Sequence, residues 1–419
     1  MILLRVAKFS LLNRKGSVLL TMLAIAVSVF VLLGVEHIRH QAKTSFGNTV
    51  SGVDLIVGGR TGDINLLLYS VFRLGNATNG VSWASYTELA THPDVAWTIP
   101  ISLGDSHRGF RVMGTTNDYF TYYRYGQKQP LHFAQGAVLS DVFDVVLGAE
   151  VARKLGYGLG DELVLAHGMA DTSFSHHDAN PFRVVGILSA TGTPADQALY
   201  AGLAGIEAIH SDWPQGAGSS SRAKAAGHAA DQNLTPTSIT AFLVGLNSKM
   251  ATFKLQRHIN DYTAEPLSAI LPGVALAQLW QMMAVMENTL RLVSAMVLLA
   301  SLLGLSAMLL ASLNERRREI AIMRVVGASP YVIFLLIQME ALLVTLCGAA
   351  SGLLLLFLAN TVMRHLLAEQ YGLSVSGNLL NEHTALILVA VVVGALIVAL
   401  IPAIAAYRNA LHTELGGKT

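Results

Sequence analysis

The sequence has little charge and almost no cysteine. Only 13% of its 419 residues are charged, whereas soluble globular proteins carry about 25%. Cys347 is the single cysteine, which excludes an intrachain disulfide, so an exported domain would depend on its own hydrophobic core for stability. The formal net charge is +1, and no basic patch is interleaved with aromatic residues, which excludes the nucleic-acid-binding class.

The sequence also lacks the common signatures of an active site. It contains no H-E-x-x-H, no G-x-S-x-G and no paired-cysteine motif, each of which brings metal ligands or a nucleophile into place. We therefore expect no catalytic site of its own and no directly bound cofactor.

The sequence instead contains long hydrophobic stretches. It is 53% hydrophobic, and about 20 consecutive apolar residues are enough to cross the hydrocarbon core of a bilayer. Four stretches qualify and predict transmembrane helices: residues 16–35, 291–313, 331–359 and 385–406. The first is expected to be an uncleaved anchor, because Glu36, His37 and Ile38 stand where a signal peptide would have its small-residue cleavage site.

The distribution of Lys and Arg predicts the orientation of these helices. Four of these basic residues fall in the amphipathic N-terminal segment, residues 1–15, and four more in the link of residues 314–330. The tail, residues 407–419, is also basic, whereas residues 360–384 hold one arginine. Because short cytoplasmic loops carry the excess of positive charge, we expect both termini and the link in the cytoplasm, and residues 36–290 and 360–384 outside.

The long outer region, residues 36–290, has a mixed α/β pattern. Short apolar runs bounded by glycine predict strands at residues 53–57, 161–165, 182–188 and 238–246, and residues 145–161 predict a strand, a helix and a turn. Residues 216–237 are rich in Gly, Ala and Ser, which predicts a mobile loop. The expected fold class is a membrane α-helical protein with four transmembrane helices and an α/β extracytoplasmic domain inserted between the first and the second.

Helical stalks are expected at both ends of this outer region. Residues 36–46 are polar and free of Gly and Pro, so they should extend the first membrane helix outward. Before the second, apolar residues recur at spacings of three and four and predict one buried helix face: Leu276, Leu279, Met283, Met286 and Leu290.

Residues 314–330, NERRREIAIMRVVGASP, form the most informative segment, which we call the basic link. The pattern predicts a short amphipathic helix with Ile320, Met323 and Val326 on one face. Gly327 suits the left-handed position that ends a helix, and Ser329 with Pro330 suits the start of the next one. A stiff charged helix joined at both ends to membrane helices could relay a displacement made by a cytoplasmic partner.

The basic link resembles the ER-x-x-EI-x-x-x-R-x-x-GA signature of the MacB/FtsX/LolC-type ABC permeases, the mechanotransmission group. The runs VVLGAEVARKLGYGLGDELVL and FRVVGILSATGTPAD look like segments of the MacB-type outer domain, and QMEAL and PAIAAYR in the last two spans also fit. The resemblance implies a permease of the bacterial inner membrane, as a homodimer or half of a heterodimer, with a MacB-like periplasmic domain.

The resemblance also implies partners. A separate cytoplasmic ABC ATPase would bind ATP and Mg and receive the basic link, used as a coupling helix, in a groove; a periplasmic adaptor or binding protein is a further expected partner. Carried over by position, the ATPase-coupling residues are Glu315, Arg316, Glu319, Arg324 and Gly327, to which we add Arg317 and Arg318. The alternative for these arginines is contact with membrane lipid headgroups under the positive-inside rule.

The leading interpretation is therefore the permease subunit of an ABC transporter. A non-transporting, FtsX-like regulator of a periplasmic partner is the alternative from another class. A lipoprotein-releasing permease and a metal-related permease are alternatives within transport.

Three further features have a structural and a functional interpretation. Glu340 lies about ten residues into the third span, about 15 Å deep at 1.5 Å per residue, and predicts a partner inside the helix bundle, either for packing or for an ion relay. Gly348 and Gly352 form a G-x-x-x-G pair for close helix packing, within one chain or across a dimer.

The third feature is a group of imidazoles and one carboxylate in the outer region: His167, His176, His177 and Asp178. Such ligands could hold zinc or copper. Solvated loop histidines without metal are the favoured alternative.

Overall fold

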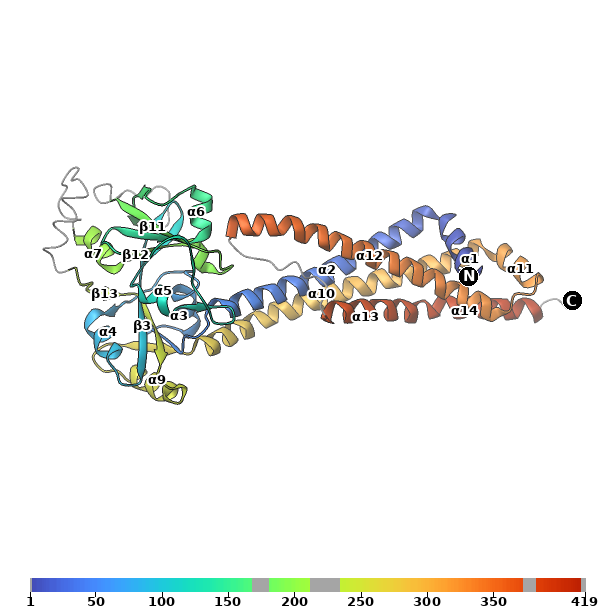
Figure 1. Ribbon diagram of the computed structural model, residues 1–419. Helices are drawn as coiled ribbons and strands as arrows, with labels where there is room; N and C mark the ends of the chain where they lie inside the picture. Colours follow the sequence, from blue (N-terminus) through green and yellow to red (C-terminus); the bar gives the residue numbers. More distant parts are fainter. Residues whose placement is uncertain (1, 168–180, 212–233, 372–381, 416–419) are drawn as a thin grey trace. The chain divides into compact units, whose positions relative to one another are not determined.

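The computed structural model describes residues 2–167, 181–211, 234–371 and 382–415 (Figure 1). The chain divides into two compact units. The helical unit comprises Met1–Gln41, Ala284–Arg364 and Ser376–Thr419, and the sheet unit comprises Ala42–Met283 and His365–Val375. Residues 216–233 of the predicted mobile loop lie outside the described residues, and so do His176, His177 and Asp178.

Long apolar helices make up the helical unit. They are α1 (Ile2–Leu12), α2 (Lys15–Thr49), α10 (Pro272–Glu315), α11 (Arg317–Val325), α12 (Pro330–Tyr371), α13 (Glu382–Val398) and α14 (Leu400–Leu415). Among the described residues, four helical stretches are long and apolar enough to cross a membrane: Lys15–Thr44, Pro272–Glu315, Pro330–Val362 and Thr384–Arg408. They coincide with the four predicted spans.

Two helix boundaries differ from the prediction. Helix α12 does not end near Ala359 but continues to Tyr371, because the sequence from 360 to 371 contains neither Gly nor Pro. The fourth span is divided at Ala399 into α13 and α14. Pro402 causes the break, because it has no N–H to donate to the Val398 carbonyl four residues earlier.

Both predicted stalks are helical, since α2 runs unbroken to Thr49 and α10 starts at Pro272. The predicted buried face of α10 is only partly right. Leu276, Leu279 and Met283 are half-buried, but Met286 and Leu290 are 55% and 45% exposed. Polar residues of α10 contact α2 at that level instead, as described below.

The sheet unit is built on one mixed sheet of eleven described strands, in the order β15-β1-β14-β3-β4-β12-β8-β11-β7, with β10 beside β3 and β9 beside β11. Strands β11 and β12 pair in parallel with β8 and β4, and the other pairs are antiparallel. Their bounds are β1 Leu55–Gly59, β3 Val95–His107, β4 Phe110–Thr115, β7 Phe133–Gly136, β8 Asp144–Leu147, β9 Glu162–Leu163, β10 Ala166–His167, β11 Phe182–Leu188, β12 Ala198–Gly202, β14 Ala241–Leu246 and β15 Leu267–Ile270.

Short elements complete the unit. Two small antiparallel pairs join β2 (Val81–Ser82) to β13 (Ser238–Ile239) and β5 (Arg124–Tyr125) to β6 (Gln129–Pro130). The helices are α3 (Asp63–Ser70), α4 (Trp83–Ala90), α5 (Asp118–Tyr122), α6 (Ala149–Leu155), α7 (Leu203–Ser211) and α9 (Thr252–Asn260). All described strands fall between α2 and α10 along the chain (Figure 1).

The predicted strands are largely confirmed. Strand β11 has the predicted bounds, and the strand, helix and turn of residues 145–161 appear as β8, α6 and a left-handed Gly156 with φ +71°. The run 238–246, predicted as one strand, is split at Thr240. There the chain leaves the small β2–β13 pair and enters the main sheet as β14.

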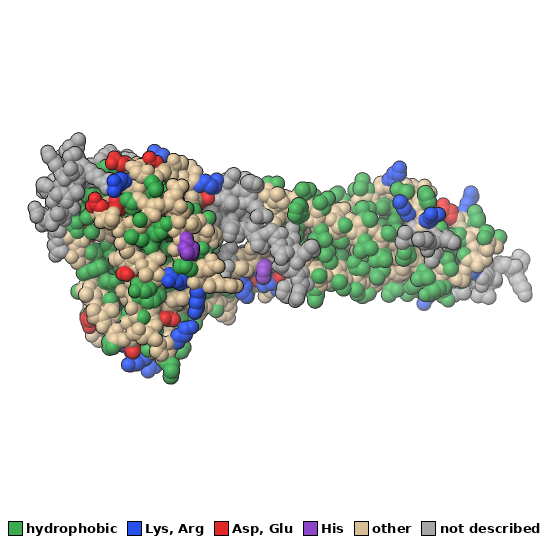
Figure 2. All heavy atoms as spheres, in the orientation of Figure 1, with side chains coloured by type: hydrophobic (Ala, Val, Ile, Leu, Met, Phe, Trp, Pro, Cys, Tyr) green, Lys and Arg blue, Asp and Glu red, His purple; other side chains and the backbone are tan. Residues whose placement is uncertain are grey.

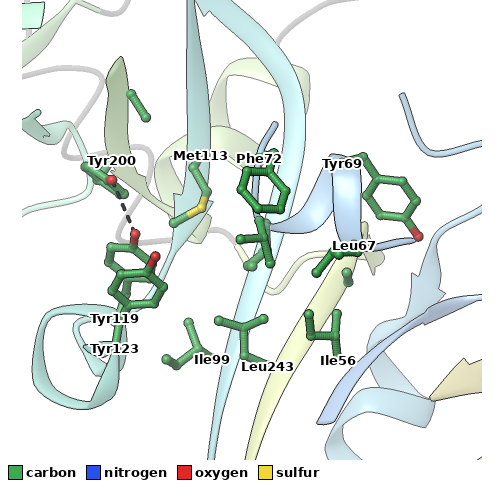
Figure 3. Packing of buried hydrophobic residues seen from close by; sticks show 14 of the residues in the cluster. Ile56, Leu67, Tyr69, Phe72, Ile99, Met113, Tyr119, Tyr123, Tyr200 and Leu243 are labelled. Atoms are coloured by element: carbon green, nitrogen blue, oxygen red, sulfur yellow. Dashed lines mark hydrogen bonds between the residues drawn. The ribbon is translucent and has the colours of Figure 1, made fainter. Parts of the chain in front are cut away.

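The largest core cluster of the sheet unit combines aliphatic and aromatic side chains (Figure 3). Ile56, Leu67 and Tyr69 lie in one part of it, and Tyr119 with Tyr200 lies in another. The rings of Tyr119 and Tyr200 stack with centroids 4.9 Å apart. A core of this kind lets the unit fold without a disulfide.

A buried arginine joins this tyrosine cluster. Arg73 is 8% exposed, and its Nη2 donates to the hydroxyls of Tyr200 at 3.1 Å and Tyr119 at 3.4 Å. The Tyr200 hydroxyl donates in turn to the Ala195 carbonyl at 2.8 Å. Burial raises the pKa of Tyr200 well above its ordinary value, so the phenol stays neutral. The charge of the Arg73 guanidinium is therefore stabilised by the dipoles of neutral hydroxyl groups.

Tyr200→Phe is therefore expected to lower the free energy of unfolding of the sheet unit by about 2 kcal/mol. It removes the closer hydroxyl acceptor of Arg73 Nη2 and the donor to the buried Ala195 carbonyl. Intrinsic fluorescence of the full chain in denaturant measures this, since all four tryptophans fall in the sequence of the sheet unit. Tyr122→Phe, at a ring that is 38% exposed, is the control. Equal midpoints for the two variants would contradict the prediction.

Candidate functional site

The basic link folds as predicted, as a short helix between two long ones. Helix α11 starts directly after α10, and Pro330 is the first residue of α12. Gly327 has φ +101°, its N–H donates to the Arg324 carbonyl at 3.0 Å, and the Ala328 N–H donates to the Met323 carbonyl at 2.9 Å. These two bonds form a Schellman C-cap, which fixes the backbone at the C-terminal end of α11.

Arg316 fastens the basic link to α12. Its Nη1 lies 2.8 Å from Glu340 Oε1, and its Nε lies 3.1 Å from Glu319 Oε2. The side chains of Arg316 and Glu340 are only 11% and 2% exposed. Arg316, one of the residues assigned to an ATPase contact, is therefore turned into the helix bundle in this chain.

The same ion pair supplies the partner that the sequence predicted for Glu340. Its carboxylate contacts Arg316 at the end of the helical unit that also holds Arg14, which we call the basic end of the bundle. The expected partner inside the bundle is confirmed, and it is an arginine of the basic link.

Arg14, the residue before α2, contacts the same N-terminal end of the basic link. Its Nη2 lies 3.0 Å from Glu315 Oε2 and donates to the Ser312 carbonyl at 3.1 Å. Glu315 is 69% exposed, so this pair is weaker than the buried one. Together, Arg14 and Arg316 connect the basic link to α2 and α12.

The outward side of α11 is apolar as well as charged. Ile322, Val325 and Val326 are 63%, 88% and 82% exposed, and Arg318 and Glu319 are exposed beside them. Val326 was expected on one face with Ile320 and Met323, but its side chain is 82% exposed, whereas those of Ile320 and Met323 are half-buried. The structure does not describe the side chain of Arg317.

Comparison with known families places this geometry in context. The model of the MacB-like periplasmic core domain matches residues 18–235, more than half of the chain, and the model of the FtsX-like permease C-terminal region matches residues 291–414. The chain belongs to the MacB/FtsX-type ABC transporter permeases. The basic link of this permease lies within the C-terminal match.

Two solved structures are similar to this permease at low identity. The periplasmic region of MacB from Actinobacillus actinomycetemcomitans is 12% identical over 55% of this chain and 94% of that chain, with a TM-score of 0.34. The extracellular domain of the noncanonic ABC-type transporter YknZ from Gram-positive bacteria is 10% identical over 52% and 98%, with a TM-score of 0.28. No curated protein sequence matches.

The glycine pair of this permease packs within one chain. A Cβ on Gly348 would lie 2.9 Å from the Ile25 side chain, and one on Gly352 would lie 2.6 Å from the Ala26 carbonyl oxygen. Both neighbours belong to α2, so the two glycines allow close approach of α2 and α12. The sequence had left contact across a dimer equally open.

A four-residue ion-pair network, which the sequence did not reveal, joins α2 and α10. Glu36 accepts from Arg291 at 2.9 Å and pairs with Arg39 on its own helix, and Arg39 lies 3.7 Å from Glu287. Glu36 and Glu287 are about one-fifth exposed. These residues replace the expected apolar contact of Met286 and Leu290 and fix where the two helices meet.

The metal hypothesis concerns residues that are largely undescribed. The backbone of His167 pairs with that of Asp105 between β10 and β3, and the other three candidates lie outside the described residues. Among the described residues, no group of three or more His, Cys, Asp or Glu is placed to hold a metal ion. Zinc or copper binding by His167, His176, His177 and Asp178 stays a prediction.

Proposed function

We propose that this permease is the transmembrane subunit of an ABC transporter and works with a separate cytoplasmic ATPase. Its four spans would place the basic link and both termini in the cytoplasm and the sheet unit, inserted between the first and second spans, in the periplasm. Members of its family work with cytoplasmic ABC ATPases and often dimerise. The chain would contribute no catalytic site, since ATP and Mg would bind to the partner.

The observation that carries this proposal is the combination of a capped, firmly tied helix with an exposed apolar surface. Arg14 and Arg316 tie the basic link to α2 and α12, so a force on α11 would reach both helices directly. Ile322, Val325 and Val326 are exposed on this helix, at the end of the spans that the proposal places in the cytoplasm. A hydrophobic groove on the ATPase would cover these three side chains.

The proposal predicts that Val325→Glu with Val326→Glu weakens binding of the ATPase about a hundred-fold. Each valine gives about 1.5 kcal/mol when it is buried, and 1.4 kcal/mol is a tenfold change in affinity. The loss of affinity is measured by titrating purified ATPase against the detergent-solubilised permease and quantifying the ATPase that co-purifies.

Met250→Glu is the matched control, because it adds a carboxylate at a residue that is 93% exposed in the sheet unit. It should leave ATPase binding unchanged and show that an added charge does not lower membrane insertion. Retention of full ATPase binding by the double valine variant would overturn the assignment of α11 as the coupling helix. The regulator, lipoprotein-releasing and metal-related alternatives share this contact and are separated by what co-purifies on the periplasmic side.

A further inference from the structure

A groove of about 380 Å³ lies between α1, α2 and α12, and no residue of α11 lines it. Its walls are apolar, and Lys8 and Lys15 are the charged residues among those that line it. The apolar lining residues are Leu11, Leu12, Val18, Leu19, Met22, Leu343, Val344 and Cys347.

The two lysines stand at one end of this groove. Lys8 is on α1 and Lys15 is the first residue of α2, and both are exposed. From Lys15 the groove follows α2 to Met22, which is about 10 Å at 1.5 Å per residue. The charged end of the groove therefore lies at the basic end of the bundle, where blue spheres gather in Figure 2. The rest of the groove extends along the apolar part of α2.

This arrangement matches the polarity of a phospholipid headgroup and the adjoining part of an acyl chain. An acyl chain needs a long apolar surface, and a phosphate needs cations at its end. Long lysine side chains can lay their methylene stems along apolar surface while their ammonium groups reach the headgroup level. A wholly apolar partner helix would leave both ammonium groups without a counter-charge.

We propose that this groove binds an anionic phospholipid of the cytoplasmic leaflet, with the phosphate at Lys8 and Lys15 and an acyl chain along the floor. The proposal rests on the membrane topology given above. A basic residue near an anionic headgroup contributes about 1 kcal/mol, which is about a five-fold change in affinity. Two lysines therefore predict a preference of about twenty-fold for an anionic over a zwitterionic lipid.

The single cysteine of the chain makes the test direct. Cys347 lies in the groove and is exposed, so a thiol-reactive bimane would attach there alone. The labelled full-length permease is reconstituted in zwitterionic nanodiscs that contain a small fraction of brominated phosphatidylglycerol or brominated phosphatidylcholine. Bromine quenches the bimane when its acyl chain occupies the groove, and we expect half-maximal quenching at about twenty-fold less phosphatidylglycerol.

Charge variants distinguish a specific lipid site from general electrostatic attraction between the basic end of the bundle and anionic lipid. Lys8→Gln with Lys15→Gln should bring the two lipids to within about two-fold of each other. Arg5→Gln removes one charge from the same helix, at a residue that does not line the groove, and should keep the preference. Equal quenching by both lipids, or an equal loss in Arg5→Gln, would overturn the proposal and indicate annular lipid only. The ATPase is absent from this measurement, so failure here is distinct from failure of the coupling assignment.

Discussion

Glu340→Ala is expected to uncouple the basic link from α12 and to destabilise the helical unit. The Arg316 side chain is 11% exposed, and the substitution removes its buried carboxylate partner and leaves it, among the described residues, only the exposed carboxylate of Glu319. Removal of one partner from a buried ion pair costs about 3 kcal/mol. That cost corresponds to about a hundred-fold shift between linked and unlinked helices. ATP hydrolysis by the reconstituted complex should fall accordingly, and the thermal midpoint of the helical circular dichroism signal should drop.

A double substitution separates stability from force transmission. Arg316→Met with Glu340→Met removes both charges and keeps similar volumes, which is often neutral or stabilising. We expect the thermal midpoint to recover while coupled ATP hydrolysis stays low, because apolar contact holds α11 less specifically than the ion pair. Glu162→Ala, at an exposed carboxylate of the sheet unit, should change neither the thermal midpoint nor the rate of ATP hydrolysis. Recovery of both quantities in the double variant would show that the pair serves folding alone.

Gly352→Leu is expected to force α2 and α12 apart. A Cβ at this position would lie 2.6 Å from a backbone carbonyl oxygen of α2, and backbone cannot rotate away as a side chain can. Overpacking of this kind costs about 3 kcal/mol. A loss of about 3 kcal/mol in folding stability should appear as a large drop in the yield of monodisperse protein and in its thermal midpoint after solubilisation.

Gly304→Leu is the matched control, because a Cβ on Gly304 of α10 has no neighbour within 4 Å among the described residues. Gly348→Leu should behave like Gly352→Leu but more mildly, since its closest contact is the Ile25 side chain at 2.9 Å. If both glycine variants matched Gly304→Leu in yield and midpoint, close packing of α2 against α12 would be wrong.

Local signals in the sequence predicted local structure well. The length of the apolar stretches predicted the four long helices, and a short apolar run predicted β11 with its observed bounds. The positive φ of Gly327 followed from its place after an amphipathic run. The break at Ala399 could also have been predicted, because Pro402 lies inside the fourth apolar stretch.

The sequence did not predict which residues far apart along the chain form ion pairs. Arg316 stands in a run of three arginines, and nothing local distinguishes the one that turns inward to Glu340 from the two that follow it. Glu36 and Arg291 are 255 residues apart, and each alone reads as an ordinary charge at a helix end. The continuation of α12 beyond the third predicted span was not predicted, because hydropathy falls after Ala359 while the helix continues to Tyr371.

The charges on α2 and α10 also restrict how these two helices can move past one another. They run in opposite directions, since Glu36 meets Arg291 and, further along α2, Arg39 meets Glu287. One helical turn is about 5.4 Å. A slip of one turn would bring Glu36 opposite Glu287 in one direction and Arg39 opposite Arg291 in the other. Like charges would then face each other either way, so the pair is free to tilt or swivel together but is held against axial sliding.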